Sequence, residues 1–275
     1  MILVDLHLHS TFSDGSLTPE QLAAQGKKRG ISVMSLTDHD TTAGLPSFMA
    51  ACSRLNVRAV PGVELSADYP TTMHILGYRL DYTHPRLAVT LESVRKARDW
   101  RNEEMCRNLR KLGFDITLEE VEAEAAGDVV ARPHMAKVMV RKGYVQDVAS
   151  AFSRYLGNSG PAYAQRERLS PEECISLIRE TGGVAVLAHP VQTADNYAEI
   201  RLVAGKLKEW GLWGMECISA KHSAEQIFQY LSIASGLGLF PTAGSDYHGS
   251  SSLSAAMGIA VPEDLLPWAR LGVTL

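Results

Sequence analysis

The 275-residue sequence has few cysteines, and none of them are paired. Cys52, Cys106, Cys174 and Cys217 are scattered and form no CxxC motif. A disulfide framework is therefore not expected in a chain of this length, and we expect the protein to reside in the reducing cytoplasm. Long apolar runs are also missing, since no stretch approaches the roughly 18 apolar residues that a membrane span needs. The short apolar N-terminus does not resemble a signal peptide, so we expect no membrane partner.

The sequence also lacks an excess of positive charge. It has 27 Lys and Arg against 31 Asp and Glu, and a formal net charge of −4. Proteins that bind long nucleic acid through broad electrostatics usually carry a basic excess. A long duplex partner is therefore not expected, and any nucleic-acid substrate must be recognised at a local pocket. The phosphate-binding patterns GxxxxGK[ST] and GxGxxG are absent as well.

What the sequence does contain is an alternation of short apolar runs with helical patterns, which is typical of βαβ units around a parallel sheet. Residues from about 86 to 155 differ, because they have almost entirely helical patterns. We predict an α/β barrel built from residues 1–100 and 166–275, with a helical insert, residues 101–165, that covers the active site. Strands are expected at residues 2–6, 31–36, 57–63, 72–78, 184–188, 212–217 and 239–243.

Histidines and carboxylates gather where these strands end. His7 and His9 are two residues apart, so they point to the same side of an extended chain. The carboxyl ends of barrel strands meet at one face, where active sites are built. Burying so many ionisable groups together would cost several kcal/mol each without a partner, and metal ions remove that cost. The candidate metal ligands are His7, His9, Asp14, His39, Glu64, His74, His189, Asp246 and His248.

The chemistry of these side chains restricts which metal ions they can bind. Imidazole mixed with carboxylate, without thiolate, suits Mn, Fe or Zn. Nine ligands exceed the four of a tetrahedral zinc site, and they suffice for two or three ions with a bridging carboxylate. Metal ions a few ångström apart clamp an attacking hydroxide and a transferring phosphoryl group. We therefore predict hydrolysis, preferentially of phosphate esters.

Six segments of the chain, in order, resemble the motifs of the polymerase and histidinol phosphatase (PHP) family. They are DLHLHSTFSDG, SLTDHDT, PGVE, HILGY, LAHP and GSDYH, and they span residues 5–248. The resemblance implies a distorted (β/α)7 TIM-like barrel and two to three divalent metal ions, Mn²⁺ first and Fe²⁺ or Zn²⁺ as alternatives. It assigns His7, His9, Glu64 and Asp246 to one ion, Glu64, His74 and His189 to a second, and Asp14, His39 and His248 to a third.

Within this family, the length, the helical insert and Arg132-Pro133-His134 most resemble the branch that removes phosphate from nucleotides. That branch implies a 3′,5′-nucleotide bisphosphate phosphatase, which converts pAp to AMP. Relatives in the branch trim RNA ends as 5′-to-3′ exonucleases. The expected partner is therefore a small nucleotide or a short RNA 5′ end. The alternatives are a phosphatase for histidinol phosphate or another small metabolite, a non-catalytic metal-stabilised module, and C–N hydrolysis as in amidohydrolases.

The expected mechanism begins with a metal-bridged hydroxide that attacks phosphorus in line. His39 or His189 would protonate the leaving group. Asp38 is expected to orient the imidazole of His39. Asp40 is either a second such carboxylate or a helix N-cap.

The candidate substrate-binding residues lie in the predicted helical insert. Arg132 opens a helix, where a guanidinium and the helix N-terminus both favour a phosphate, and His134 lies beside it. Arg101 and Asn102 lie on the long helix that enters the insert, where an exposed charged face is the alternative. The insert is expected to form a partial lid that leaves room for a nucleotide end. Other polar or aromatic candidates have equally ordinary structural roles; they are Glu216, Lys221, Trp100, Trp210 and Trp213, and core packing is favoured for the three tryptophans.

Overall fold

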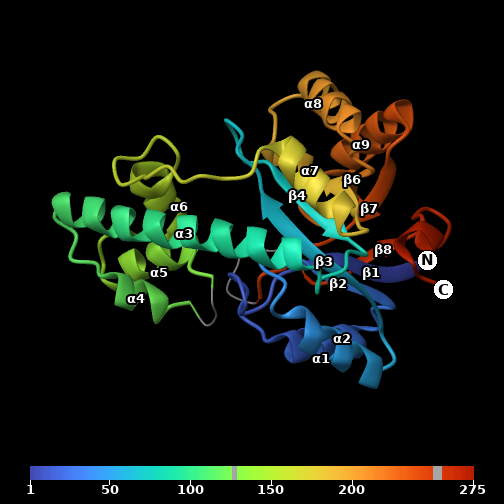
Figure 1. Cartoon of the computed structure of the whole chain (residues 1–275), viewed down its shortest axis with the longest axis horizontal. Coiled ribbons are helices and arrows are strands. Elements are labelled where there is room, and N and C mark those ends of the chain that lie inside the picture. The colour runs from blue at the N-terminus through green and yellow to red at the C-terminus, as the bar shows by residue number, and fades with distance from the viewer. Residues whose placement is uncertain (126–128, 250–255) are drawn as a thin grey trace.

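A computed structural model describes residues 1–125, 129–249 and 256–275 of the chain. Its centre is an eight-stranded sheet that curls into a nearly closed barrel, with helices on the outside and further helices extending to one side (Figure 1). The strand order is β7-β6-β5-β4-β3-β2-β1-β8. The strands are β1 (Ile2–Leu8), β2 (Val33–Leu36), β3 (Arg58–Ser66), β4 (His74–Tyr78), β5 (Val184–Leu187), β6 (Gly214–Ile218), β7 (Phe240–Ala243) and β8 (Ile259–Val261).

All seven predicted strands are present, but the sheet is not entirely parallel. Strand β4 runs antiparallel to both β3 and β5. Only residues 67–73 separate β3 from β4, which is too short for the crossover that a parallel pair requires. Strand β8, which has three residues and pairs antiparallel with β1, was not predicted from the sequence. The expected mixed α/β barrel is therefore correct, and the expected all-parallel sheet is wrong.

The barrel closes at the end where the polar side chains lie. The amide of His9 donates to the carbonyl of Tyr247 at 3.0 Å, and the amide of Tyr247 donates to the carbonyl of His7 at 3.3 Å. These bonds join the end of β1 to the segment that follows β7. Two parts of the chain that are more than 200 residues apart in sequence therefore share one edge of the site.

The helices follow the expected capping chemistry. Thr18 and Ser170 both cap a helix with their side chains, and a proline follows each at the first helical position. The helices are α1 (Pro19–Arg29), α2 (Leu45–Arg54), α3 (Pro85–Lys111), α4 (Leu118–Glu122), α5 (Arg132–Arg141), α6 (Val148–Ala151), α7 (Pro171–Glu180), α8 (Tyr197–Glu209) and α9 (Ala224–Leu237), with short π or 3₁₀ segments at Phe152–Leu156, Pro190–Gln192 and Trp268–Leu271.

Helix α3 links two hydrophobic cores. Leu87 and Leu91 in its first half pack in the barrel core, whereas Met105, Cys106 and Leu109 in its second half pack in a core formed with α4, α5 and α6. The predicted boundary between barrel and insert, at residues 100 and 101, therefore falls inside one continuous helix. The division itself stays a prediction, and residues 126–128 of the predicted insert lie outside the described residues. Within the described ranges, no helix is both long and apolar enough to cross a membrane.

Candidate metal centre

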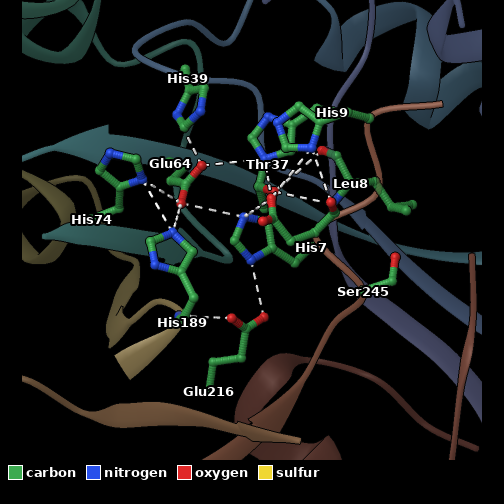
Figure 2. Close-up of polar contacts among 12 residues, drawn as sticks. His7, Leu8, His9, Thr37, His39, Glu64, His74, His189, Glu216 and Ser245 are labelled. Carbon is green, nitrogen blue, oxygen red and sulfur yellow. Dashed lines mark hydrogen bonds and ion pairs between the residues drawn. The ribbon is translucent and has the colours of Figure 1, made fainter. Parts of the chain in front are cut away.

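The structure brings all nine predicted ligands to one end of the barrel. His7 lies in β1 and His9 directly follows it, Glu64 lies in β3, and His189 lies two residues after the end of β5 (Figure 2). His74 is the first residue of β4, and because β4 is antiparallel, its first residue lies beside the last residues of its neighbours. The remaining ligands lie in loops after strands; they are Asp14, His39, Asp246 and His248.

Glu64 lies at the centre of the cluster and is fully buried. Its two carboxylate oxygens face different imidazoles, as a carboxylate that bridges two ions would. The Oε1 atom is 3.0 Å from His74 Nδ1, 3.0 Å from His189 Nε2 and 3.3 Å from His7 Nε2. The Oε2 atom is 2.9 Å from His39 Nδ1 and 3.2 Å from His9 Nε2.

Two aspartates complete the centre on the other side of His9. Asp14 Oδ1 is 3.2 Å from His248 Nε2, and Asp246 Oδ1 is 3.3 Å from His9 Nε2. Eight of the nine side chains, all except His189, form three groups, and within each group the ligand atoms lie within 4.8 Å of one another. The groups are His9, Asp14, His39 and His248; His7, His9 and Asp246; and His39, Glu64 and His74.

The residues present fit divalent ions on their own chemistry. His7 Nε2, His9 Nε2, His39 Nδ1, Asp14 Oδ1 and Glu64 Oε2 are buried and make no well-directed hydrogen bond within the described residues. Each buried polar atom without a hydrogen-bond partner lowers the stability of the fold by about 1–3 kcal/mol. Imidazole nitrogens and carboxylate oxygens converging on common points satisfy one another through a cation.

The charges of the cluster are strongly coupled. Burial by itself would raise the pKa of Glu64, but the facing imidazoles of His39, His7 and His74 hold it well below its usual range. Burial would lower the pKa of His7, but the carboxylates of Glu216, Glu64 and Asp246 raise it well above its usual value. The site therefore keeps its carboxylates ionised, which is the form that binds cations.

Glu216, on β6, positions two of the histidines. Its Oε1 is 3.0 Å from His7 Nδ1, which leaves His7 Nε2 facing Glu64 and Asp246 (Figure 2). Its Oε2 accepts a hydrogen bond of 2.8 Å from the backbone amide of His189, a residue with a strained φ of 22°. From the sequence alone, Glu216 was equally compatible with a site residue and with an ordinary loop residue. The available signal was a charged residue inside a buried apolar strand.

Asp38 has a different role from the one predicted. Its carboxylate accepts hydrogen bonds from the Ser10 amide at 2.7 Å, the Ser10 hydroxyl at 2.6 Å and the Ser13 hydroxyl at 2.6 Å. It therefore fixes the loop that carries Asp14, and the expected contact with His39 is not among its contacts with described residues. Gly15 is required in the same loop, since a Cβ there would lie 2.1 Å from a backbone oxygen of His9.

Asp40 links the barrel to helix α3 and to Arg166 beside the cluster. Its carboxylate accepts from the Ser66 amide at 2.9 Å, from Arg166 at 3.1 Å, and from Arg98 of α3. Burial by itself would raise the pKa of Asp40, but Arg98 and Arg166 lower it below its usual range. Neither role predicted for Asp40 is found: its carboxylate pairs with arginines instead of orienting His39, and helix α2 begins at Leu45 with Gly44 at the N-cap position.

A cavity of about 260 Å³ adjoins the cluster. Asp14, His39 and His74 line one part of it, and the other part carries an excess of guanidinium groups. Burial and the neighbouring arginines lower the pKa of Arg101, which reflects positive charge that nearby carboxylates do not neutralise. An anion would relieve this repulsion. The arginines that line the cavity are Arg98, Arg101, Arg132, Arg166 and Arg168.

Two of the four predicted substrate-binding residues line this cavity, and two do not. Arg132 and Arg101 both line it. Asn102 does not line the cavity. It accepts a hydrogen bond of 2.8 Å from Arg101 and donates one of 2.9 Å to the Val130 carbonyl. His134 Nδ1 accepts a 3.1 Å bond from the Ala131 amide at the start of α5. Asn102 therefore orients Arg101, and His134 closes a helix end.

Comparison with known proteins decides the family. Residues 5–113 match the PHP domain. The chain is 33% identical to a 5′-3′ exoribonuclease of Haemophilus influenzae over 89% of each chain. It is 32% identical to a 3′,5′-nucleoside bisphosphate phosphatase of Chromobacterium violaceum, covering 98% of this chain and 95% of the relative. The chain belongs to the PHP family.

Solved structures agree with this family fold. An amidohydrolase from Chromobacterium violaceum, with bound sulfate and no metal, superposes with a TM-score of 0.89 at 30% identity, covering 98% of this chain and 95% of the other. A structure described as a metal-dependent phosphoesterase from Bifidobacterium adolescentis superposes with a TM-score of 0.82 at 28% identity, covering 98% and 93%. The PHP resemblance is thus confirmed, and the protein is a hydrolase of the metal-dependent phosphoesterase class.

Proposed function

We propose that this PHP phosphoesterase removes a terminal phosphate from nucleotides, foremost from 3′,5′-bisphosphates (pAp to AMP), with short RNA 5′ ends as a second substrate. One observation carries the proposal. A single cavity has candidate metal ligands along one part and five arginines along the other. A nucleotide bisphosphate has two phosphates that need two separate cationic sites. The relatives named bisphosphate phosphatase and exoribonuclease support the same substrate class.

In this proposal the nine clustered side chains hold two to three divalent ions, Mn²⁺ first. His7, His9, Glu64 and Asp246 would hold one ion, and Glu64, His74 and His189 a second. Asp14, His39 and His248 would hold a third. The ions, when bound, activate a water molecule and neutralise charge on the phosphoryl oxygens.

The remaining steps belong to the side chains of the chain itself. A water oxygen bonds to phosphorus, the bond from phosphorus to the 3′-oxygen breaks, and the 3′-oxygen takes a proton. His39 or His189 supplies that proton if it is not fully committed to a metal ion, and the lining of the cavity favours His39. Arg132 and Arg101 hold the phosphate that is not cleaved. Arg132 is kept in place by the Leu156 carbonyl at 3.2 Å and by Asn158 Oδ1 at 2.9 Å.

Phosphate release in the presence of Mn²⁺ tests the proposal. The panel contains pAp, AMP, a 5′-phosphorylated RNA oligonucleotide and histidinol phosphate, each with a His9→Ala control. We expect rapid release from pAp that the control abolishes, and shortening of the oligonucleotide would add the exonuclease activity. Arg132→Ala should raise KM for pAp far more than for a simple aryl phosphate. Release from histidinol phosphate alone would keep the metal centre and overturn the nucleotide substrate.

A further inference from the structure

A second cavity, of about 690 Å³, adjoins the five arginines that line the first cavity, which we call the arginine wall. Trp100 of α3 lines it and is 54% exposed. This contradicts the favoured core-packing role for Trp100, whereas Trp210 and Trp213 do pack against the barrel core. The other lining residues are Asp68, Ala97, Gln165, Arg166, Glu167 and Arg168.

The two cavities share a wall. Arg166 and Arg168 line both of them. On α3, Arg98 and Arg101 line the cavity beside the metal ligands, and Trp100 lies on the neighbouring face of the same helix turn. Arg166 and Arg168 therefore face both cavities, so a phosphate bound to them would have one cavity on either side.

The chemistry of the second cavity suits a nucleoside. An exposed indole face stacks on a nucleobase, and stacking of this kind tolerates any base. The amide of Gln165 and the carboxylate of Glu167 offer donors and acceptors to a base edge or a ribose. Arg168 Nε is buried and has no hydrogen-bond partner in the described ranges, so it can donate to a phosphate oxygen.

We propose that the second cavity binds a second nucleoside, which is joined to the first through the phosphate on the arginine wall. The substrate class then includes 3′-phosphorylated dinucleotides such as ApAp as well as pAp. Water attacks the terminal phosphorus, the bond to the 3′-oxygen breaks, and the products are ApA and inorganic phosphate. This inference rests on the proposed function, since it assumes that the terminal 3′-phosphate lies at the metal centre.

Phosphate release from ApAp and pAp, measured with the Mn²⁺-loaded enzyme, tests this subsite. Trp100→Ala should lower kcat/KM for ApAp about tenfold and leave kcat/KM for pAp unchanged. Trp100→Phe should retain most of the ApAp activity because it keeps an aromatic face. Phe228→Ala is the matched control, since Phe228 is another exposed aromatic side chain, on α9. Equal effects of Trp100→Ala on both substrates, or none, would overturn the subsite.

Binding separates this inference from the proposed function. Titration of the enzyme with ApA should quench tryptophan fluorescence, and the quench should disappear in Trp100→Phe. If pAp is not hydrolysed but ApA still quenches Trp100, the proposed reaction fails and the nucleoside subsite stands. If pAp is hydrolysed and ApA leaves the fluorescence unchanged, the reaction stands and the subsite is wrong.

Discussion

At the scale of single residues, the chemistry of this site depends on the side chains that contact the candidate ligands as well as on the ligands themselves. Glu64 concentrates negative charge among five imidazoles, and Glu216 determines which nitrogen of His7 faces them. Because His7 Nδ1 faces Glu216 Oε1 at 3.0 Å, Nε2 is the ring atom that faces Glu64 and Asp246 and that a metal ion would use. The buried glutamate would therefore influence a metal ion held by His7 through its contact with that histidine.

The first prediction concerns the tautomer of His7. Glu216→Gln can present an amide N–H to His7 Nδ1, which moves the ring proton to Nε2 and blocks that ligand atom. We expect Mn²⁺ affinity to fall about 10- to 100-fold, measured by isothermal titration. Glu225→Gln, an exposed glutamate on α9, is the control and should bind Mn²⁺ like the wild type. Unchanged affinity in Glu216→Gln would show that His7 does not depend on this contact.

The second prediction concerns pH. Burial lowers the pKa of His134 from 6.5 to about 4. Between these values the unfolded chain binds a proton that the folded chain does not, so stability is present above pH 6.5 and is lost as pH falls toward 4. The loss is up to about 3 kcal/mol.

Thermal unfolding of the chelator-treated protein between pH 4 and 7 measures this effect. His134→Asn can keep the acceptor for the Ala131 amide but does not titrate, so its melting temperature should fall less steeply with acid than that of the wild type. Parallel pH curves for the two proteins would assign the acid sensitivity to other groups.

At the scale of helices and strands, the position of an element was predictable and its direction was not. Apolar runs placed all seven main strands, since a buried strand needs such a run whichever way it points. The antiparallel course of β4 depends on pairing with β3 and β5, which periodicity does not encode. The gathering of the nine candidate ligands at one end of the barrel was still predicted, because their residue types and motif order do not depend on strand direction. Glu216 and the partners of Asp38 depend on three-dimensional neighbours and were not predictable in the same way.

The third prediction concerns the attachment of helix α3 to the barrel. Asp40 forms ion pairs with Arg98 of α3 and with Arg166. Asp40→Asn leaves two buried guanidinium groups without their counter-charge, so we expect the free energy of unfolding to fall by about 3 kcal/mol in urea denaturation. Asp68→Asn removes the half-exposed partner of Arg168 and should cost less than about 1 kcal/mol. Similar losses in both variants would contradict the account of Asp40 as the fastening point.

At the scale of the whole molecule, the fold brings side chains from distant parts of the sequence to one end of the barrel. Six strands, β1 to β5 and β7, with the loops after them bring the candidate ligands from residue 7 to residue 248 to one end of the barrel, and helix α3 with the segment 165–168 adds arginines beside them. A net charge of −4 conceals this local positive wall. Composition alone therefore excluded a broad nucleic-acid surface, while the cavity provides a local anion site.

Anomalous X-ray scattering from a crystal grown with Mn²⁺ tests the central claim most directly. The account predicts two or three Mn²⁺ ions per chain among the three ligand groups, with the Glu64 carboxylate bridging two of them. A single ion, or ions bound away from Glu64, would contradict a multinuclear centre built on these nine side chains.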